Sequence, residues 1–270
     1  MLNRTIWFPF FMGWFLLIFP PQAIPKTSTK PSPKRGKTNG IKPDPKIEAF
    51  LKPYRKKLLK KMAKIIVTTQ KSFTRRRPES TLGNLVAEKV MQYLKAHYPK
   101  TDIFISNVTG LRSDIPPGNI TLGTLFEVMP FENQIVIIKL TGRQLKRVFQ
   151  GFAKKGGEPI SGATCYLDKK RKQAHNILIN GKPIQNKKLY HLATLDYLAE
   201  TGWMKKRLHR PKLKKTGVLI RDAVLWSLKN KGLGTHPYLD KRVQYKSLPR
   251  KNSATKPASP STQPHKKDKK

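Results

Sequence analysis

The sequence has a single cysteine and very few acidic residues. Because a disulfide needs two thiols, Cys165 cannot form one within the chain, and a cysteine-based zinc site is excluded as well. We expect Cys165 to be a buried structural thiol. Asp and Glu number 15 against 56 Lys and Arg, so the formal net charge is +41 at pH 7. A charge of this size predicts polyanionic neighbours such as nucleic acid, anionic lipid, lipopolysaccharide or nucleotides.

Long apolar stretches are also rare, and the longest lies close to the N-terminus. Residues 6–19 follow Arg4 and form an apolar run that is short for a membrane span but typical of the central region of a signal peptide. We predict that residues 1–23 are a signal peptide and that the protein is exported to the periplasm or secreted. Pro21 makes cleavage after Ala23 a poor match, so retention as an N-terminal membrane anchor stays open.

Recognisable catalytic motifs are missing from the sequence. The six histidines are scattered and are not paired with carboxylates at the spacing of metal ligands. No Ser-His-Asp pattern, Walker phosphate loop or GxGxxG motif occurs either. We therefore predict no catalytic residue, no metal ligands and no resident cofactor in this chain.

Two basic segments rich in Pro, Ser and Thr flank the central region. Residues 24–46 hold seven basic residues and one acidic residue, and residues 246–270 hold eight and one. Both segments are too polar to build a core, so we expect a linker and a disordered tail. Residues 47–245 form the predicted folded domain. This region has 40 basic and 13 acidic residues, so the positive charge belongs to the domain as well as to its tails.

Helical and strand patterns alternate within the predicted domain. Apolar residues at helical spacing predict helices over residues 47–62, 79–98, 142–155 and 218–231. Runs rich in β-branched residues predict strands over residues 64–69, 101–107, 133–141 and 242–246. Residues 121–129 read as a short helical or mixed segment, and residues 175–199 as two strands around a turn at Asn180 and Gly181. The expected fold class is α+β.

Five separated blocks share a further pattern. They are ESTLGNLVAE (79–88), SNVTGLRSDIPPGNITLGTLFEVMPFENQIVIIKLTGRQLK (106–146), Ser161-Gly162, ILINGKPIQNKKLYHLATLDYLAETG (177–202) and TGVLIRDAVLWSLKNKG (216–232). In this order they resemble the C-terminal domain of 5'-nucleotidases, the group of the periplasmic UDP-sugar hydrolase and ecto-5'-nucleotidase. The resemblance implies a layered α/β domain that holds a nucleoside between two aromatic rings, while a separate N-terminal metallophosphoesterase domain hydrolyses the phosphate.

The same resemblance implies a set of nucleotide-binding residues. Phe131 and Tyr197 fall where the family stacks the base between two rings. Arg112 falls where an arginine meets anionic or polar groups of the ligand, and Asn107 would hydrogen bond to the base. Arg76 matches another ligand-facing arginine.

Structural roles stay open for all five residues. The two rings would then pack in the core, Asn107 would cap its own turn, and Arg112 would pair with Asp114 or a carbonyl. Arg76 would be solvated within a basic run, and its register is ambiguous by one residue because Arg75 and Arg77 flank it.

The sequence departs from the family pattern at two places. Val108 and Thr109 stand where the family has glycines that permit positive φ, so the loop must be built differently. Trp203 ends the motif that closes in Gly-Gly-Asp in the family, so the carboxylate that meets the ribose hydroxyls is missing. We expect Trp203 to fill or extend the stacking site.

Three functions are consistent with these patterns. The first is an exported nucleotide- or nucleoside-binding domain that acts as a carrier or sensor, or together with a separately encoded metallophosphoesterase. The metal motifs of that enzyme, such as Asp-x-His and Gly-Asn-His-Asp/Glu, do not occur here, so its divalent metals would belong to another chain. The second is a polyanion-binding protein with a vestigial pocket, and the third is a nucleotide hydrolase that uses unrecognised residues.

Overall fold

The computed structural model describes residues 43–208, 211–234 and 238–248. The predicted signal peptide, most of the predicted linker and nearly all of the predicted tail lie outside these residues. By their internal contacts, a first unit ends at Phe50 and a second begins at Leu51. Helix α1 (Pro45–Met62) passes through this boundary and has no buried residue. Within the described ranges, no helix is long and apolar enough to cross a membrane.

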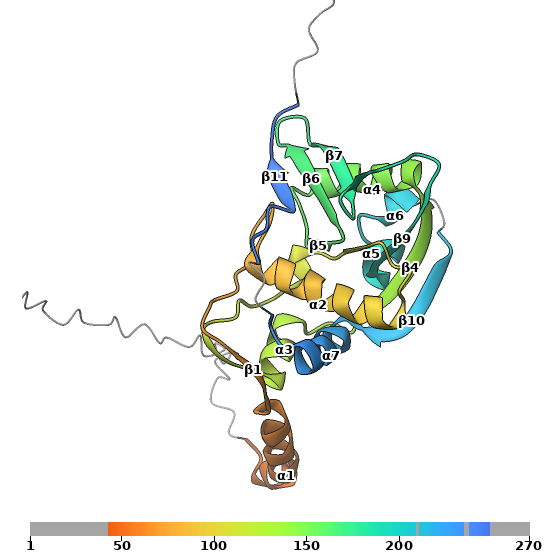
Figure 1. Ribbon diagram of the computed structural model, residues 1–270. Coiled ribbons are helices and arrows are strands. Elements are labelled where there is room, and N and C mark those ends of the chain that lie inside the picture. The colour runs from red at the N-terminus through yellow and green to blue at the C-terminus, as the bar shows by residue number, and fades with distance from the viewer. Residues whose placement is uncertain (1–42, 209–210, 235–237, 249–270) are drawn as a thin grey trace, which may run out of the picture. The chain divides into compact units, whose positions relative to one another are not determined.

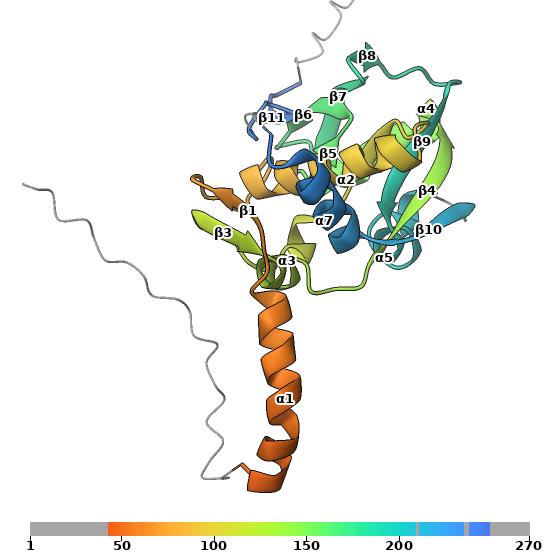
Figure 2. The same ribbon diagram turned by 60° about the horizontal axis from the view of Figure 1, so that its bottom comes forward.

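A five-stranded mixed sheet forms the centre of the second unit (Figures 1 and 2). Its strand order is β10 (Leu213–Leu219), β4 (Gln134–Thr141), β9 (Leu189–Leu195), β2 (Ile103–Ile105) and β5 (Ile160–Ser161). Four successive residues of β4, 135–138, are buried. Because successive side chains of a strand point to opposite faces, both faces of the sheet are covered. Helices α2 (Thr81–His97) and α7 (Ile220–Lys231) pack together on one face, and α4 (Gly142–Lys154) packs on the other.

The remaining described strands form two smaller sheets. One has the order β11 (Val243–Tyr245), β6 (Ala163–Asp168), β7 (Gln173–Ile179) and β8 (Lys182–Pro183), with β11 parallel to β6. The other is an antiparallel ribbon of β1 (Ile65–Thr69) and β3 (Gly118–Thr121). The short helices are η1 (Val108–Gly110), α3 (Leu122–Val128), α5 (Asp196–Glu200) and α6 (Lys205–Leu208). Helices therefore pack in layers on mixed and antiparallel sheets, which confirms the predicted α+β class and the layered α/β arrangement.

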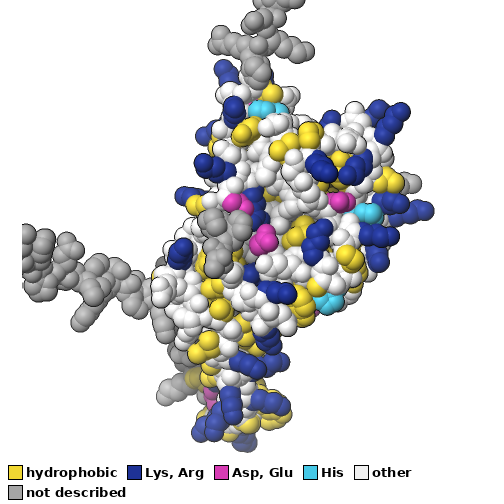
Figure 3. Space-filling view, in the orientation of Figure 1, with side chains coloured by type: hydrophobic (Ala, Val, Ile, Leu, Met, Phe, Trp, Pro, Cys, Tyr) yellow, Lys and Arg dark blue, Asp and Glu magenta, His cyan; other side chains and the backbone are white. Residues whose placement is uncertain are grey.

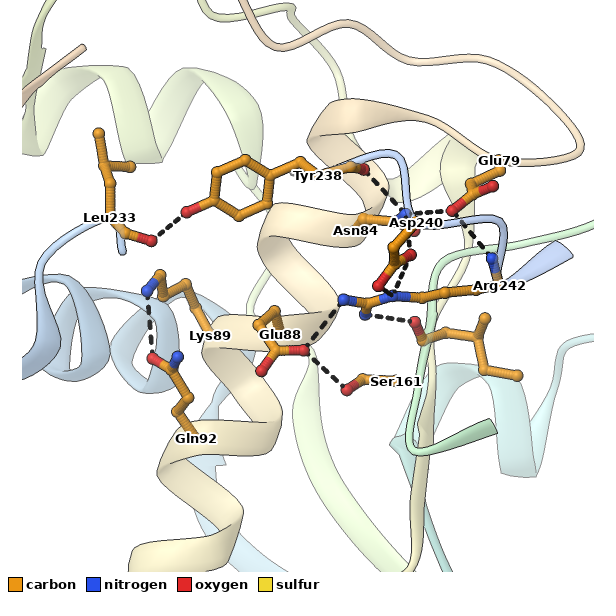
Figure 4. A network of polar contacts seen from close by, with 11 residues as sticks. Glu79, Asn84, Glu88, Lys89, Gln92, Ser161, Leu233, Tyr238, Asp240 and Arg242 are labelled. Atoms are coloured by element: carbon orange, nitrogen blue, oxygen red, sulfur yellow. Dashed lines mark hydrogen bonds and ion pairs between the residues drawn. The ribbon is translucent and has the colours of Figure 1, made fainter. Parts of the chain in front are cut away.

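The C-terminal segment is fastened to α2 through Arg242 (Figure 4). The guanidinium donates from Nε to both carboxylate oxygens of Asp240 at 2.8 Å and from Nη2 to Glu88 at 3.1 Å. Its Nη1 donates to the carbonyl of Ile160 at 3.0 Å, and the residue is 6% exposed. Past β11, the Leu248 N–H donates to Asp168 at 2.8 Å. Leu248, the last residue that the structure describes, is therefore held against the end of β6.

The predicted helices at α1, α2, α4 and α7 are confirmed, and so are strands at β1, β2, β4 and β11. Cys165 is buried, as expected, and burial raises the pKa of its thiol to about 12. The turn at Asn180 and Gly181 is present, with φ of 49° and 76°, but the strand that follows it, β8, has two residues. The longer strand β9 pairs with β4 and β2 in the central sheet instead. Residues 196–199, predicted as part of a strand, lie in α5.

Candidate ligand-binding site

The segment that follows β2 forms a tight turn that carries Asn107. Helix η1 closes with a hydrogen bond from the Gly110 N–H to the Asn107 carbonyl at 3.2 Å. None of the three residues Val108, Thr109 and Gly110 has a φ in the left-handed region. A 3-10 turn of this kind accepts β-branched residues. The loop is therefore built without the left-handed backbone that the glycines of the family pattern would permit.

The Asn107 side chain is fixed by its own turn and is largely buried, with 7% of the residue exposed. Its Nδ2 donates to Thr109 Oγ1 at 2.9 Å, an acceptor that glycine would not supply. Gly110 leaves room for the amide, because a Cβ there would lie 3.0 Å from Asn107 Oδ1. That Oδ1 atom is buried and has no hydrogen-bond partner. A buried acceptor in this state costs about 1–3 kcal/mol, which a ligand N–H or O–H would offset.

Phe131 lies in the loop between α3 and β4, with 46% of the residue exposed. The guanidinium carbon of Arg112 lies 5.8 Å from the centroid of its ring, within the range of a cation–π contact. Arg112 also holds its own backbone in place, since its N–H donates to the Val128 carbonyl at 2.8 Å. The loop is braced by Arg221 of α7, whose Nη1 donates to the Met129 carbonyl at 2.7 Å. The exposed ring of Phe131 therefore extends from a loop that is held next to Arg112 and Arg221 by hydrogen bonds to nearby carbonyls.

Tyr197 is the second residue of α5 and is 53% exposed. The preceding residue, Asp196, accepts two hydrogen bonds at Oδ1. One comes from the Tyr197 N–H at 2.7 Å and the other from the Gln134 N–H at 3.2 Å. One carboxylate oxygen therefore ties the start of β4, three residues after Phe131, to the residue that bears the second ring.

These segments surround a cavity of about 300 Å³. We call it the aromatic pocket, and its lining residues are Asn107, Thr109, Gly110, Arg112, Phe131, Asn133 and Tyr197. A much smaller cavity of about 10 Å³ shares Asn107, Gly110, Phe131 and Asn133 with it. The smaller volume is about that of one water molecule, so of these two cavities only the aromatic pocket has room for a planar ligand.

Four of the five predicted site residues therefore line one cavity, namely Asn107, Arg112, Phe131 and Tyr197. Arg76 is exposed and is not among the lining residues. Its neighbours have structural partners: Arg75 pairs with Asp114 at 2.8 Å, and Arg77 pairs with Glu158 at 2.8 Å. The ligand role of Arg76 stays a prediction.

Trp203 lies elsewhere, and the expectation that it fills or extends the stacking site is wrong. Its indole packs against α4, where a Cβ on Gly151 would come within 2.8 Å of the ring. The side chain also packs against the hydrophobic core and lines neither cavity. The glycine at position 151 gives the indole a place on the helix, so the residue serves packing.

Several residues that line or support the aromatic pocket are not among the predicted binding residues. Asn133 adds an amide to the lining, and its only signal is a polar residue between an exposed aromatic and a buried strand. Thr109 and Gly110 contribute through Asn107, as described above. The sequence does not identify Asp196 as a residue that supports the site, because its Oδ1 accepts hydrogen bonds from backbone N–H groups.

Glu158 anchors the η1 turn from the other side. Its Oε2 accepts from the Val108 N–H at 2.7 Å and its Oε1 accepts from Arg77 Nη2 at 2.8 Å. The residue is 3% exposed, and this burial raises the pKa of its carboxyl above the ordinary value of 4.5 in spite of the two contacts. The turn is thus tied to the segment that precedes α2.

The lining of the aromatic pocket offers two rings, a guanidinium, amides and the hydroxyls of Thr109 and Tyr197, but no carboxylate or imidazole. In the part of the chain that the structure describes, no group of three or more His, Cys, Asp or Glu side chains is arranged to hold a metal ion. The groups present suit a planar ligand with hydrogen-bonding edges and an anionic or carbonyl oxygen.

Comparison with known proteins agrees with the fold and the motifs. A family model described as the 5'-nucleotidase, C-terminal domain, matches residues 61–206, just over half of the chain. The chain belongs to this family. The matched region of this 5'-nucleotidase C-terminal domain contains every residue that lines the aromatic pocket.

Relatives of the 5'-nucleotidase C-terminal domain are longer proteins. The trifunctional nucleotide phosphoesterase protein YfkN of Bacillus subtilis is 37% identical over 75 residues, which cover 28% of this chain and 5% of YfkN. Protein UshA of Escherichia coli is 27% identical over 128 residues, or 46% of this chain and 22% of UshA. The crystal structure of a 5'-nucleotidase precursor from Thermus thermophilus has the same fold, with a TM-score of 0.64 at 22% identity over 75% of this chain and 43% of that one. The chain thus spans less than half the length of each.

Proposed function

We propose that this 5'-nucleotidase C-terminal domain binds a nucleotide or nucleoside in the aromatic pocket. The observation that carries the proposal is the meeting of Phe131 and Tyr197, which are far apart in the sequence and about half exposed, at one cavity beside Arg112. Large exposed rings at a cavity are platforms for a planar ligand, and a base stacked on an aromatic side chain gains about 1–3 kcal/mol.

The polar groups of the pocket suit the rest of such a ligand. The planar, permanently charged guanidinium of Arg112 would meet a phosphate or a carbonyl oxygen of the base. Asn107 Oδ1 would accept from a base N–H or a ribose hydroxyl, which would satisfy a buried atom that has no partner now. Because the lining contains no carboxylate, amides and the hydroxyls of Thr109 and Tyr197 would have to recognise the ribose. A volume of about 300 Å³ suits one nucleoside rather than a dinucleotide.

The proposal assigns no chemistry to this chain. The domain would act as a carrier or sensor, or it would position a nucleotide for a separately encoded metallophosphoesterase. Export, expected from residues 1–23, is part of the same proposal, since an exported nucleotide-binding domain would meet nucleotides outside the cytoplasm.

Calorimetric titration with AMP and adenosine in about 0.3 M salt tests the proposal, because a Debye length of about 6 Å suppresses attraction by surface charge alone. Phe131→Ala should weaken binding roughly ten- to a hundred-fold. Arg112→Lys should weaken AMP binding, since an ammonium cannot reproduce the planar contact. Leu189→Ala is the matched control: this residue is 47% exposed and lies at the other end of β9 from Tyr197.

Equal binding by Phe131→Ala and the parent, or loss of all binding in salt, would show that the aromatic pocket does not hold the ligand. The polyanion-binding function would then take its place. A phosphate-release assay with Mn²⁺ or Co²⁺ addresses the third function, for which we expect background turnover. Release of phosphate that disappears on substitution of one particular His or Asp would overturn that expectation.

A further inference from the structure

Residues 51–64 form an unusually basic surface, which we call the basic helix surface. It consists of the part of α1 that belongs to the second unit and the two residues that follow it. Seven of its fourteen residues are Lys or Arg and none is acidic. All seven are exposed: Lys52, Arg55, Lys56, Lys57, Lys60, Lys61 and Lys64.

The same surface carries a row of apolar side chains. Leu51, Tyr54, Leu58 and Met62 follow one another at intervals of three or four residues, so they share one side of the helix. Tyr54 is 61% exposed and Leu58 is 53% exposed. Since no residue of α1 is buried, this side of the helix does not contribute to the core.

Charge and apolar surface together indicate the kind of partner. A nucleic acid would need the Lys and Arg side chains but would gain nothing from Leu58. An anionic lipid surface uses both: the apolar side chains enter the boundary between headgroups and acyl chains, while the basic side chains meet the lipid phosphates. Long Lys side chains reach the headgroups even where their stems lie on apolar surface. In Figure 3, Lys and Arg side chains lie beside hydrophobic ones over α1.

We propose that the basic helix surface binds the surface of an anionic membrane, with α1 lying in the interface rather than spanning it. This function is separate from ligand binding by the aromatic pocket. It would hold the protein at a lipid surface by charge and by shallow insertion of Tyr54 and Leu58.

Flotation of the full chain with lipid vesicles tests the proposal. The measured quantity is the ratio of binding to vesicles with about one third phosphatidylglycerol over binding to pure phosphatidylcholine. This ratio removes charge-independent association by residues 6–19. We expect a ratio of at least about ten at about 0.1 M salt, falling at about 0.5 M salt as the Debye length shrinks from ~10 Å to ~4 Å.

Two variants divide the contributions. Lys56→Glu/Lys60→Glu should lower the ratio roughly tenfold or more, whereas Lys170→Glu/Lys172→Glu, the same charge change in the β6–β7 turn, should keep most of it. Leu58→Asn should also lower binding to anionic vesicles, roughly threefold to tenfold. Since α1 has no buried residue, these changes leave the core intact, and circular dichroism checks this directly.

Three results would overturn the proposal. The first is a ratio near one for the parent protein. The second is an equal loss in the two charge-reversal variants, which would show that net charge alone drives binding. The third is unchanged vesicle binding by Leu58→Asn together with complete displacement from vesicles by a short DNA duplex, which would assign the surface to nucleic acid.

Discussion

The carboxylate of Asp196 accepts a hydrogen bond from the backbone N–H of Gln134 at 3.2 Å. This contact joins two segments that each carry one ring of the aromatic pocket. Phe131 is three residues before Gln134, and Tyr197 directly follows Asp196. The separation of the two rings therefore depends on a residue that does not itself line the cavity.

We predict that Asp196→Ala weakens AMP binding and lowers the free energy of unfolding by about 1–2 kcal/mol, because two backbone N–H groups lose their acceptor. Asp196→Asn, which retains one acceptor oxygen, should behave closer to the parent. Hydrogen exchange of the Gln134 amide reports the contact directly and should accelerate in the Ala variant. An unchanged exchange rate would contradict the role given to Asp196.

Gly110→Ala should reduce ligand binding with little change in stability. The new Cβ would lie 3.0 Å from Asn107 Oδ1 and 3.2 Å from Nδ2, so the amide must shift. The backbone itself is not strained, since Gly110 does not have a positive φ. A several-fold weaker AMP affinity, roughly 1 kcal/mol, with an unchanged unfolding midpoint is the expected outcome. Thr109→Val, which removes the hydroxyl that accepts from Asn107 Nδ2, should produce a similar loss of affinity.

Glu158 predicts a specific pH dependence of stability. Burial raises its pKa in the folded protein above 4.5, so its contribution to stability is fully present below pH 4.5 and is lost as pH rises through the folded pKa. The difference in unfolding free energy between the parent and Glu158→Gln should therefore favour the parent more at pH 4 than at pH 7. Urea unfolding of both proteins at the two pH values measures this difference. A difference that grows with pH would contradict the stated direction.

Arg242→Ala should be among the most destabilising substitutions at a polar residue, by about 2–4 kcal/mol. It removes a guanidinium with four hydrogen bonds to three residues and leaves the part-buried carboxylates of Asp240 and Glu88 without it. Arg242→Lys should recover only part of the loss, since one ammonium cannot reach all these acceptors. Lys170→Ala, in an exposed turn, should change the unfolding free energy by less than about 0.5 kcal/mol.

Local sequence patterns predict the amphipathic helices well and the sheet partners poorly. Helices α2, α4 and α7 each show apolar residues at helical spacing that pack on the sheet. The sequence does not predict strand β10, because Lys214, Lys215 and Gly217 interrupt its apolar pattern. This composition suits an edge strand that has no buried residue. The sequence also predicts the wrong partner for β9. The Asn180-Gly181 turn favours pairing of the next strand with β7, whereas burial of the apolar residues of β9 favours the central sheet.

The residues of the aromatic pocket and its supports also divide into those that the sequence predicts and those that it does not. Its four predicted residues follow from a family resemblance carried by short motifs around Asn107, Phe131 and Tyr197. Asp196 and Glu158 could not be identified this way, because each acts on a backbone N–H that the fold alone brings near. For Trp203 the family motif predicts a place at the site, but the indole packs against Gly151 of α4 instead.

The η1 turn has a consequence for the entropy of binding. In the unfolded chain, Val108 and Thr109 have fewer accessible backbone conformations than two glycines would have. They therefore lose less conformational entropy on folding, which stabilises the folded state by about 0.4–1 kcal/mol for each residue where the native φ and ψ suit it. With the Asn107 amide held by Thr109 and the Val108 N–H held by Glu158, little freedom remains for a ligand to remove. The turn is therefore preorganised, and a ligand that fits its geometry would lose little affinity to ordering the loop.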